Sequence, residues 1–123
     1  SKNGVVVIDL DGDGHEQTGW AVMYLHVASK DRVAVNTVVN TGDIIGHPSC
    51  EGGKASGTHV HVARKYNGEW ILADGPLPFV LSGYRAHAGQ KPYEGSLTKD
   101  DEIVTACDCG SFATRITRPL TSP

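Results

Sequence analysis

The chain has few cysteines, no excess of basic residues and no long apolar run, and each scarcity excludes a class of protein. Three cysteines in 123 residues are too few for a disulfide-dense scaffold, and a chain of this length buries a core without disulfides or a metal. The formal net charge of −3 comes with no basic face, so nucleic acid is not an expected partner. We expect no membrane span, and no signal peptide is visible.

The cysteines are Cys50, Cys107 and Cys109, an odd number that leaves one thiol over if a disulfide forms. Cys107 and Cys109 are too close in the sequence for an easy mutual bridge, but either of them could reach Cys50. The sequence leaves open whether this bridge forms. If it does, it favours an oxidising compartment.

Strand patterns dominate the chain, whereas patterns with a helical period are few and glycine is abundant at 15 residues. Residues 3–10 and 20–28 are short runs rich in apolar and β-branched side chains, and each predicts a strand. Residues 31–49 predict two short strands broken by Asn and Thr-Gly turns. Residues 102–107 predict a late strand, while the proline-rich residues 74–83 are excluded from the centre of a sheet.

The clearest pattern is a hairpin over residues 58–73, in which Asn67 and Gly68 form the tight turn. Together with the other strand patterns it predicts an all-β fold, a small antiparallel sandwich or open barrel.

Three alternating acidic residues stand in the loop that follows the first predicted strand. Asp9, Asp11 and Asp13, followed by Gly14, match the first half of a calcium-binding loop, in which alternating carboxylates converge on one cation. The second half does not match, because the twelfth position is Trp20 instead of a bidentate glutamate. Two interpretations stay open: a short calcium-binding turn, or a solvated loop whose Asp-Gly steps supply positive φ angles.

Two histidines stand two positions apart in the predicted hairpin. In an extended strand His59 and His61 project to one face, while Val60 and Val62 face the core behind them. Two imidazoles in this arrangement can approach one metal ion or one substrate. With six histidines in the chain the spacing also arises by chance, so the pair alone does not establish a metal or substrate site.

A third histidine, His26, lies near the end of the 20–28 strand, on the face that it is expected to share with Tyr24. A lone histidine there is also explained as a partly buried side chain satisfied by a backbone carbonyl.

The order of three sequence blocks resembles the lysostaphin-type (LytM-like) zinc metallopeptidases, which cut peptidoglycan. The blocks are Tyr-Leu-His-Val-Ala at residues 24–28, Gly-Asp-Ile-Ile-Gly at 42–46 and Ser-Gly-Thr-His-Val-His at 56–61, and the resemblance extends from about residue 4 to about residue 72. It implies a barrel-sandwich hybrid of duplicated hairpins, with residues 1–92 as the C-terminal part of the metallopeptidase core and residues 93–123 as an extension.

The resemblance also implies a function for each histidine. His61 would be a zinc ligand, His59 the base that takes the proton of the attacking water, and His26 a group that stabilises charge on the tetrahedral intermediate. The implied protein hydrolyses peptide bonds in peptidoglycan, has a cell-wall peptide as its partner, and acts outside the cell or in the cell envelope. The zinc would be its cofactor, with calcium as a second candidate at the acidic loop.

The family completes its zinc site with a His-x-x-x-Asp motif that precedes the blocks matched here, and one histidine cannot hold a catalytic zinc. Three explanations compete. The chain is a C-terminal fragment whose N-terminal part supplies the ligands; it is a non-catalytic module that binds cell-wall peptide or a partner amidase; or His15, His47 and Cys50 replace the ligands. We favour the first, because an inactive copy has little reason to keep three family histidines.

A carrier domain of the lipoyl or biotinyl type ranks last, because residues 38–46 resemble its hairpin but the lysine attachment turn is absent.

Overall fold

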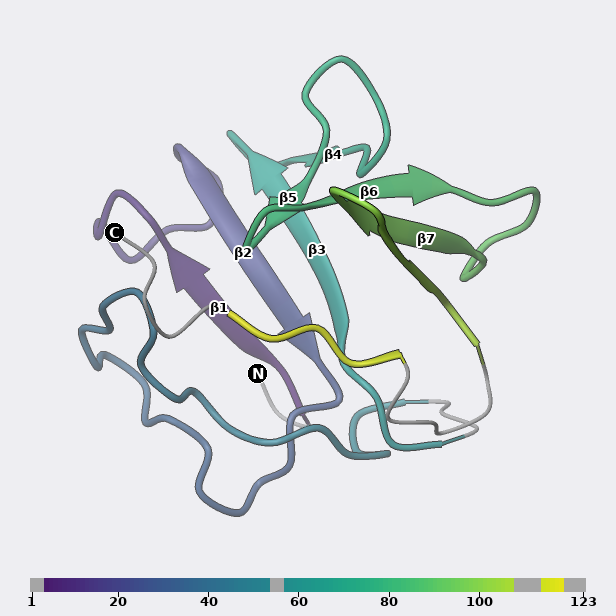
Figure 1. Cartoon of the computed structure of the whole chain (residues 1–123). Coiled ribbons are helices and arrows are strands. Elements are labelled where there is room, and N and C mark those ends of the chain that lie inside the picture. Colours follow the sequence, from purple (N-terminus) through teal and green to yellow (C-terminus); the bar gives the residue numbers. More distant parts are fainter. Residues whose placement is uncertain (1–3, 54–56, 108–113, 119–123) are drawn as a thin grey trace. The chain divides into compact units, whose positions relative to one another are not determined.

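The computed structural model describes residues 4–53, 57–107 and 114–118, and these residues form strands and loops without an α-helix (Figure 1). The strands make two antiparallel four-stranded sheets, so the predicted all-β class is confirmed. The chain divides into two compact units, Ser1–Ile71 and Leu72–Pro123, and each contains one sheet. In the described part of the chain, no helix is long and apolar enough to cross a membrane.

The first sheet consists of β1 (Val6–Asp9), β2 (Trp20–Leu25), β3 (His61–Tyr66) and β4 (Glu69–Ile71), in that order across the sheet. All four strands lie within segments that their apolar and β-branched residues predict to be extended. The short connection between β3 and β4 is the turn of the predicted hairpin. Within the sheet β2, which ends just before His26, pairs with β3, which begins at His61.

The turn of this hairpin follows from its two residues. Asn67 and Gly68 both have positive φ angles, 50° and 82°, as a type I′ turn requires, and Asn and Gly adopt such angles at low cost. The Asn67 side-chain oxygen accepts a hydrogen bond from the Gly19 N–H at 2.8 Å, and the Asn67 N–H donates to the Gly19 carbonyl at 3.0 Å. The loop between β1 and β2 is therefore attached to the tip of the hairpin.

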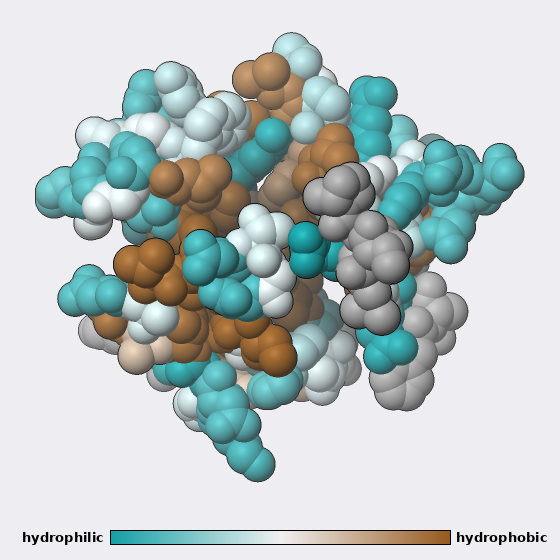
Figure 2. Space-filling view, turned by 60° about the vertical axis from the view of Figure 1, so that its left-hand side comes forward, coloured by the Kyte–Doolittle hydropathy of each residue, from teal (hydrophilic) through white to brown (hydrophobic). Residues whose placement is uncertain are grey.

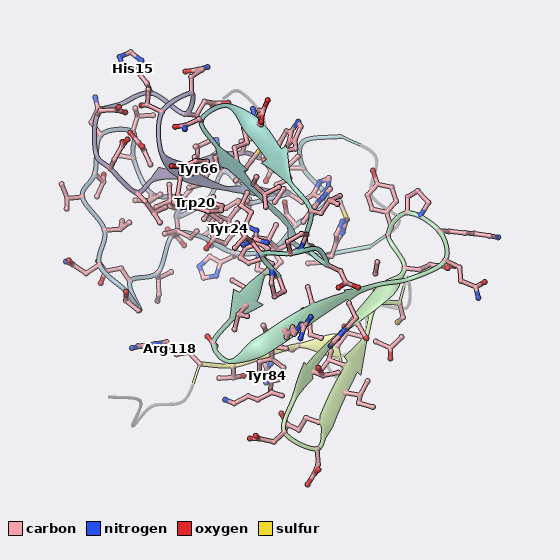
Figure 3. All side chains as sticks on the ribbon, turned by 90° about the horizontal axis from the view of Figure 1, so that it is seen from above. His15, Trp20, Tyr24, Tyr66, Tyr84 and Arg118 are labelled. Atoms are coloured by element: carbon pink, nitrogen blue, oxygen red, sulfur yellow. The ribbon has the colours of Figure 1, made fainter. Side chains whose placement is uncertain are left out.

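Three aromatic side chains, of Trp20, Tyr24 and Tyr66, lie on one face of the first sheet. Trp20 of β2 lies opposite Tyr66 of β3, with ring centroids 4.9 Å apart, and the Arg64 guanidinium lies 5.6 Å from the Trp20 ring centroid (Figure 3). Among the described residues of this unit, the buried apolar side chains are few: Val6, Ala21 and Val27. Hydrophobic atoms accordingly reach the surface in several places (Figure 2).

The prediction of two strands within residues 31–49 is wrong, because these residues form a loop with no strand longer than an isolated bridge. The Val33 N–H donates to the Ile45 carbonyl and closes the loop at its base. Between these residues Val35 and Val38 are each 87% exposed. A β-branched run forms a strand where one of its faces is buried and a partner strand is available, and this loop has neither.

The second sheet consists of β5 (Val80–Leu81), β6 (Tyr84–Ala88), β7 (Gly95–Lys99) and β8 (Glu102–Thr105). β8 confirms the predicted late strand, and β5 is an edge strand, as the prolines before it require. The patterns did not predict β6 and β7. The domain boundary expected at residues 92/93 falls between these two strands, whereas the compact units divide at Ile71 and Leu72.

The bridge to Cys50, which the sequence left open, does not form. Cys50 is a free, exposed cysteine, whereas Cys107 is disulfide-bonded. Cys109, the remaining cysteine, lies outside the described residues. Cys50 is held in the first unit by the hydrogen bonds of its neighbours Ser49 and Glu51, so its place is fixed by contacts other than a bridge.

We predict that Gly46→Ala lowers the free energy of unfolding of the first unit by about 1–3 kcal/mol. A Cβ atom at Gly46 would lie 2.4 Å from Cγ1 of Val27, which is only 3% exposed, and the φ of +154° is unfavourable for alanine. Urea unfolding measures the loss. Gly57→Ala is the matched control, because no atom lies within 4 Å of its added Cβ. Equal stability of the two variants would contradict the prediction.

Candidate functional site

The backbone at His26 breaks the strand alternation that the sequence predicts. Tyr24 lies opposite Val62 and Leu25 opposite His61, so a continued β2 would put His26 on the Tyr24 face, away from His61. Instead β2 ends at Leu25, and His26 adopts a left-handed conformation with φ 66°. The expectation that His26 shares a face with Tyr24 as part of the strand is therefore wrong, and the turn gives the imidazole a different direction.

The turn brings His26 against His59. The two ring centroids are 4.4 Å apart and the ring planes are inclined by 42°. His26 is buried, with 6% of its surface exposed, whereas His59 is exposed and precedes β3, paired with Ser49 in an isolated bridge. The prediction that Val60 faces the core is wrong. β3 begins only at His61, and Val60 is 37% exposed.

Backbone carbonyls fix the tautomer of both rings. His26 Nδ1 lies 2.7 Å from the Glu51 carbonyl oxygen, and His59 Nδ1 lies 2.8 Å from the Gly57 carbonyl oxygen. A carbonyl oxygen only accepts, so each Nδ1 must carry a hydrogen. In the neutral form each ring therefore presents Nε2 as a proton acceptor or metal-binding atom, an arrangement that is common in histidine ligands.

His61 completes the group as the first residue of β3. It is half-buried, and this burial, followed by the neighbouring charges of His26 and His59, lowers its pKa from the ordinary value of 6.5. The structure therefore brings together the three histidines that the sequence singled out. At neutral pH the lowered pKa favours the uncharged imidazole of His61, which is the form that binds a metal.

The described residues do not form a complete zinc site around these histidines. In the described part of the chain, Asp9, Asp11 and Asp13 are the only group that offers three ligand atoms within 4.8 Å of one another. The candidate replacements do not join the histidines in such a group: His15 projects from the exposed loop after β1 (Figure 3), and His47 and Cys50 are also exposed. Nothing therefore supports the explanation that these three residues replace the missing ligands.

Two residues near the histidines were not predicted. Ser49 contacts the backbone of both His26 and His59, and the Glu51 carbonyl holds the His26 ring. Their contribution rests mainly on backbone atoms and on one hydroxyl, for which the sequence carries no signal. A left-handed non-glycine residue costs about 1–2 kcal/mol, and hydrogen bonds of about 0.5–1.5 kcal/mol each offset that cost at His26.

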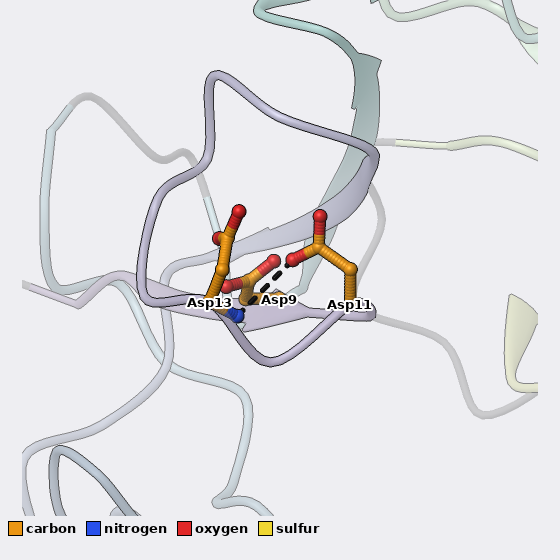
Figure 4. A group of neighbouring side chains, drawn as sticks. All are labelled: Asp9, Asp11 and Asp13. Carbon is orange, nitrogen blue, oxygen red and sulfur yellow. Dashed lines mark hydrogen bonds between the residues drawn. The ribbon is translucent and has the colours of Figure 1, made fainter.

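The three aspartates form a second cluster at the opposite end of β2, where β1 runs into its loop (Figure 4). Asp11 accepts a hydrogen bond from the Asp13 N–H at 3.2 Å, and Asp13 accepts from the His15 N–H and from the Thr18 hydroxyl. Asp9 Oδ2 accepts from the Gly14 N–H, whereas Asp9 Oδ1 is buried without a hydrogen-bond partner.

Their titration reflects this crowding. The bond from the Asp13 N–H lowers the pKa of Asp11, but the carboxylates of Asp9 and Asp13, together with desolvation, outweigh it and raise that pKa overall. The Thr18 hydroxyl and then the His15 N–H lower the pKa of Asp13 to about 2. Crowded carboxylates with one unsatisfied buried oxygen have the chemistry of a site for a hard cation.

Comparison with protein-family models, with curated protein sequences and with solved structures gives no match for this chain.

We predict that His61 of the metal-free protein titrates below the ordinary value of 6.5 and that His26→Asn raises its pKa without restoring that value. Burial is the larger cause of the lowered pKa and remains in the variant, while the charge at position 26 is removed and asparagine tolerates the positive φ. The NMR titration of the His61 ring protons measures the change, with the His87 signal as an internal control. An unchanged His61 titration would contradict the prediction.

The lowered pKa of His61 also makes the stability of the folded protein depend on pH. Because the folded pKa is the lower one, the unfolded chain takes up the proton first, so the stability associated with neutral His61 is complete above about 6.5 and is lost as the pH falls. The low pKa of Asp13 affects stability at lower pH. The stability that its ionised carboxylate provides is lost as the pH falls from about 3.8 to about 2.

Proposed function

We propose that this domain belongs to a zinc-dependent metalloendopeptidase that hydrolyses peptide bonds of peptidoglycan outside the cell or in the cell envelope. One observation carries the proposal: His26, His59 and His61, which occupy the motif positions of the lysostaphin-type family, lie together although they come from separate segments. The all-β fold agrees with the proposal, and the finer barrel-sandwich hybrid architecture is part of it.

Zinc fits part of this group. His61 supplies one neutral imidazole, but a catalytic zinc needs about three protein ligands, and the described residues do not complete the set. The proposal therefore requires ligands beyond this group, such as the upstream His-x-x-x-Asp motif of the family. When bound, zinc would polarise the scissile carbonyl and make water a nucleophile at neutral pH.

His59 has the geometry of a general base. Its Nδ1–H is engaged by the Gly57 carbonyl, so its Nε2 is the atom that accepts a proton from water and later returns it to the leaving amine. The ring is exposed, so substrate and solvent can reach Nε2. The carbonyl that holds Nδ1 also stabilises the imidazolium once the proton is taken up.

His26 can stabilise an oxyanion in only one protonation state. Its Nδ1–H is engaged by the Glu51 carbonyl, so Nε2 donates a hydrogen bond only when the ring carries both protons. The His59 ring is 4.4 Å away, and simultaneous charge on both rings is unfavourable. The proposal therefore requires a protonated His26 beside a neutral His59 at the start of the reaction.

We predict that zinc binding and catalysis separate among the histidines in the natural protein that carries this domain. His61→Ala should lose both zinc and cleavage of purified peptidoglycan, whereas His59→Gln should keep zinc and lose about 10²–10⁴-fold in kcat. His26→Asn should keep zinc and lose about 10²–10³-fold. Zinc is measured by elemental analysis, and cleavage is measured by release of peptide amines.

His87→Gln is the matched control, because its imidazole lies in the second unit and bonds to Thr98. It should retain both zinc and activity. Zinc bound equally by His61→Ala, or cleavage that persists after complete chelation, would reject the peptidase.

The second candidate is a non-catalytic module that holds a cell-wall peptide or a partner amidase. The incomplete ligand set around the histidines favours it. Peptide binding that persists in chelator and in His61→Ala, without hydrolysis, would support this module over the enzyme.

We also propose that Asp9, Asp11 and Asp13 bind calcium. The support is the convergence of three carboxylates within 4.8 Å and the buried, unpartnered Asp9 Oδ1, which a cation would satisfy. A solvated acidic loop is the competing explanation, and the exposure of Asp11 and Asp13 favours weak binding over tight binding.

We predict that calcium shifts the backbone NMR signals of residues 9–14 with a dissociation constant of about 0.1–1 mM, the range of extracellular calcium modules. Asp9→Asn should abolish the shifts, because it removes charge at the buried oxygen. Asp43→Asn, in the loop closed by Val33 and Ile45, removes the same charge elsewhere and should leave them intact. Unchanged spectra at 10-fold higher calcium would exclude the site.

A further inference from the structure

Ser49 is attached to both members of the His26–His59 pair. Its N–H and its hydroxyl both donate to the His26 carbonyl oxygen, at 2.7 and 2.9 Å. Its own carbonyl accepts from the His59 N–H at 3.4 Å, within the bridge that pairs the two residues. A single residue thus fixes the backbone of His26 and places the backbone of His59 beside it.

The same hydroxyl acts on the ring of His26 through Glu51. Ser49 Oγ accepts a hydrogen bond from the Glu51 N–H at 3.0 Å, and the Glu51 carbonyl holds His26 Nδ1 at 2.7 Å. The Glu51 carboxylate accepts from the Ser29 N–H at 2.9 Å and holds the other side of this turn. The hydroxyl of Ser49 therefore both donates and accepts, and each bond constrains a different part of His26.

These bonds matter because His26 is not where strand geometry would put it. The left-handed φ of 66° is unfavourable for histidine, and a relaxed, extended residue would carry the ring to the Tyr24 face, away from His61. The two donors of Ser49 on the His26 carbonyl hold the backbone in the conformation that brings the ring 4.4 Å from His59.

We infer that Ser49 is the positioning residue of the imidazole pair: its hydroxyl keeps His26 turned toward His59 and, through Glu51, keeps the hydrogen of the ring on Nδ1. The catalytic consequence of this inference rests on the proposed function, because a peptidase needs both Nε2 atoms to face one substrate. Ser49 itself touches no reacting atom.

The experiment uses the full chain labelled with ¹⁵N in its histidines. Long-range ¹H–¹⁵N spectra report which ring nitrogen carries the hydrogen, and ring-to-ring cross-peaks report the contact between His26 and His59. At a pH at which the rings are neutral, wild type should show His26 with the hydrogen on Nδ1 and a cross-peak to His59. Ser49→Ala should lose the cross-peak and shift the two His26 nitrogens toward the average of the tautomers.

Two isosteric variants separate the hydroxyl from the volume of the side chain. Ser49→Thr keeps the hydroxyl and should keep the cross-peak and the tautomer. Ser49→Val has the shape of threonine without the hydroxyl and should lose both the cross-peak and the tautomer. Ser29→Ala is the control in the adjoining turn, because it keeps the N–H that binds Glu51. Its His26 signals should match those of wild type.

A folded Ser49→Ala or Ser49→Val with an unchanged tautomer and cross-peak would overturn the inference. Unfolding of both hydroxyl-free variants, with Ser49→Thr folded, would also overturn it, because the hydroxyl would then support the whole unit instead of the imidazole pair.

These readouts do not require zinc or hydrolysis, so failure of the proposed peptidase leaves the positioning test intact. Where the natural protein does cleave peptide, Ser49→Ala should lower kcat by about 10- to 100-fold with little change in KM, and Ser49→Thr should restore it. An unaffected kcat would reject the positioning role of Ser49 without touching the peptidase assignment.

Discussion

The anchoring of His26 in a left-handed turn is the constraint on which the histidine site depends. Without that turn, the register of β2 and β3 would place His26 and His61 on opposite faces of the first sheet. The strain is offset locally, by two donors from Ser49 on the carbonyl of His26 and by the Glu51 carbonyl on its ring. Strained non-glycine residues concentrate at functional sites, where the surrounding bonds make them persist.

The same anchoring determines what the imidazoles can do. Because backbone carbonyls occupy Nδ1 of His26 and of His59, Nε2 is the remaining ring nitrogen that can accept a proton or bind a metal in each neutral ring. This suits one ring as a base and requires the other to be charged before it can act as a donor. Burial lowers the pKa of the third imidazole, His61, and so favours its uncharged form.

The acidic cluster lies at the other end of the same strand. Asp9 is opposite Ala21 near the start of β2, and His26 follows its end, so about 16 Å of strand separates the two groups. The loop that bears the acids is attached to the β3–β4 hairpin through Gly19 and Asn67, whereas the histidines are attached through Ser49. A cation at the acids would therefore order one end of the sheet without entering the imidazole group.

The sequence by itself determined what depends on neighbouring residues: the all-β class, the apolar segments that become β1 and β2, and the hairpin turn at Asn67 and Gly68, whose φ angles follow from residue type. It also singled out the three histidines through their motif. Only the tertiary structure decided the conformation of His26, the loop at residues 31–49 and the free thiol of Cys50. The reason is physical: these features rest on contacts between distant segments, such as the bond from Ser49 to a carbonyl 23 positions away, and local periodicity carries no record of them.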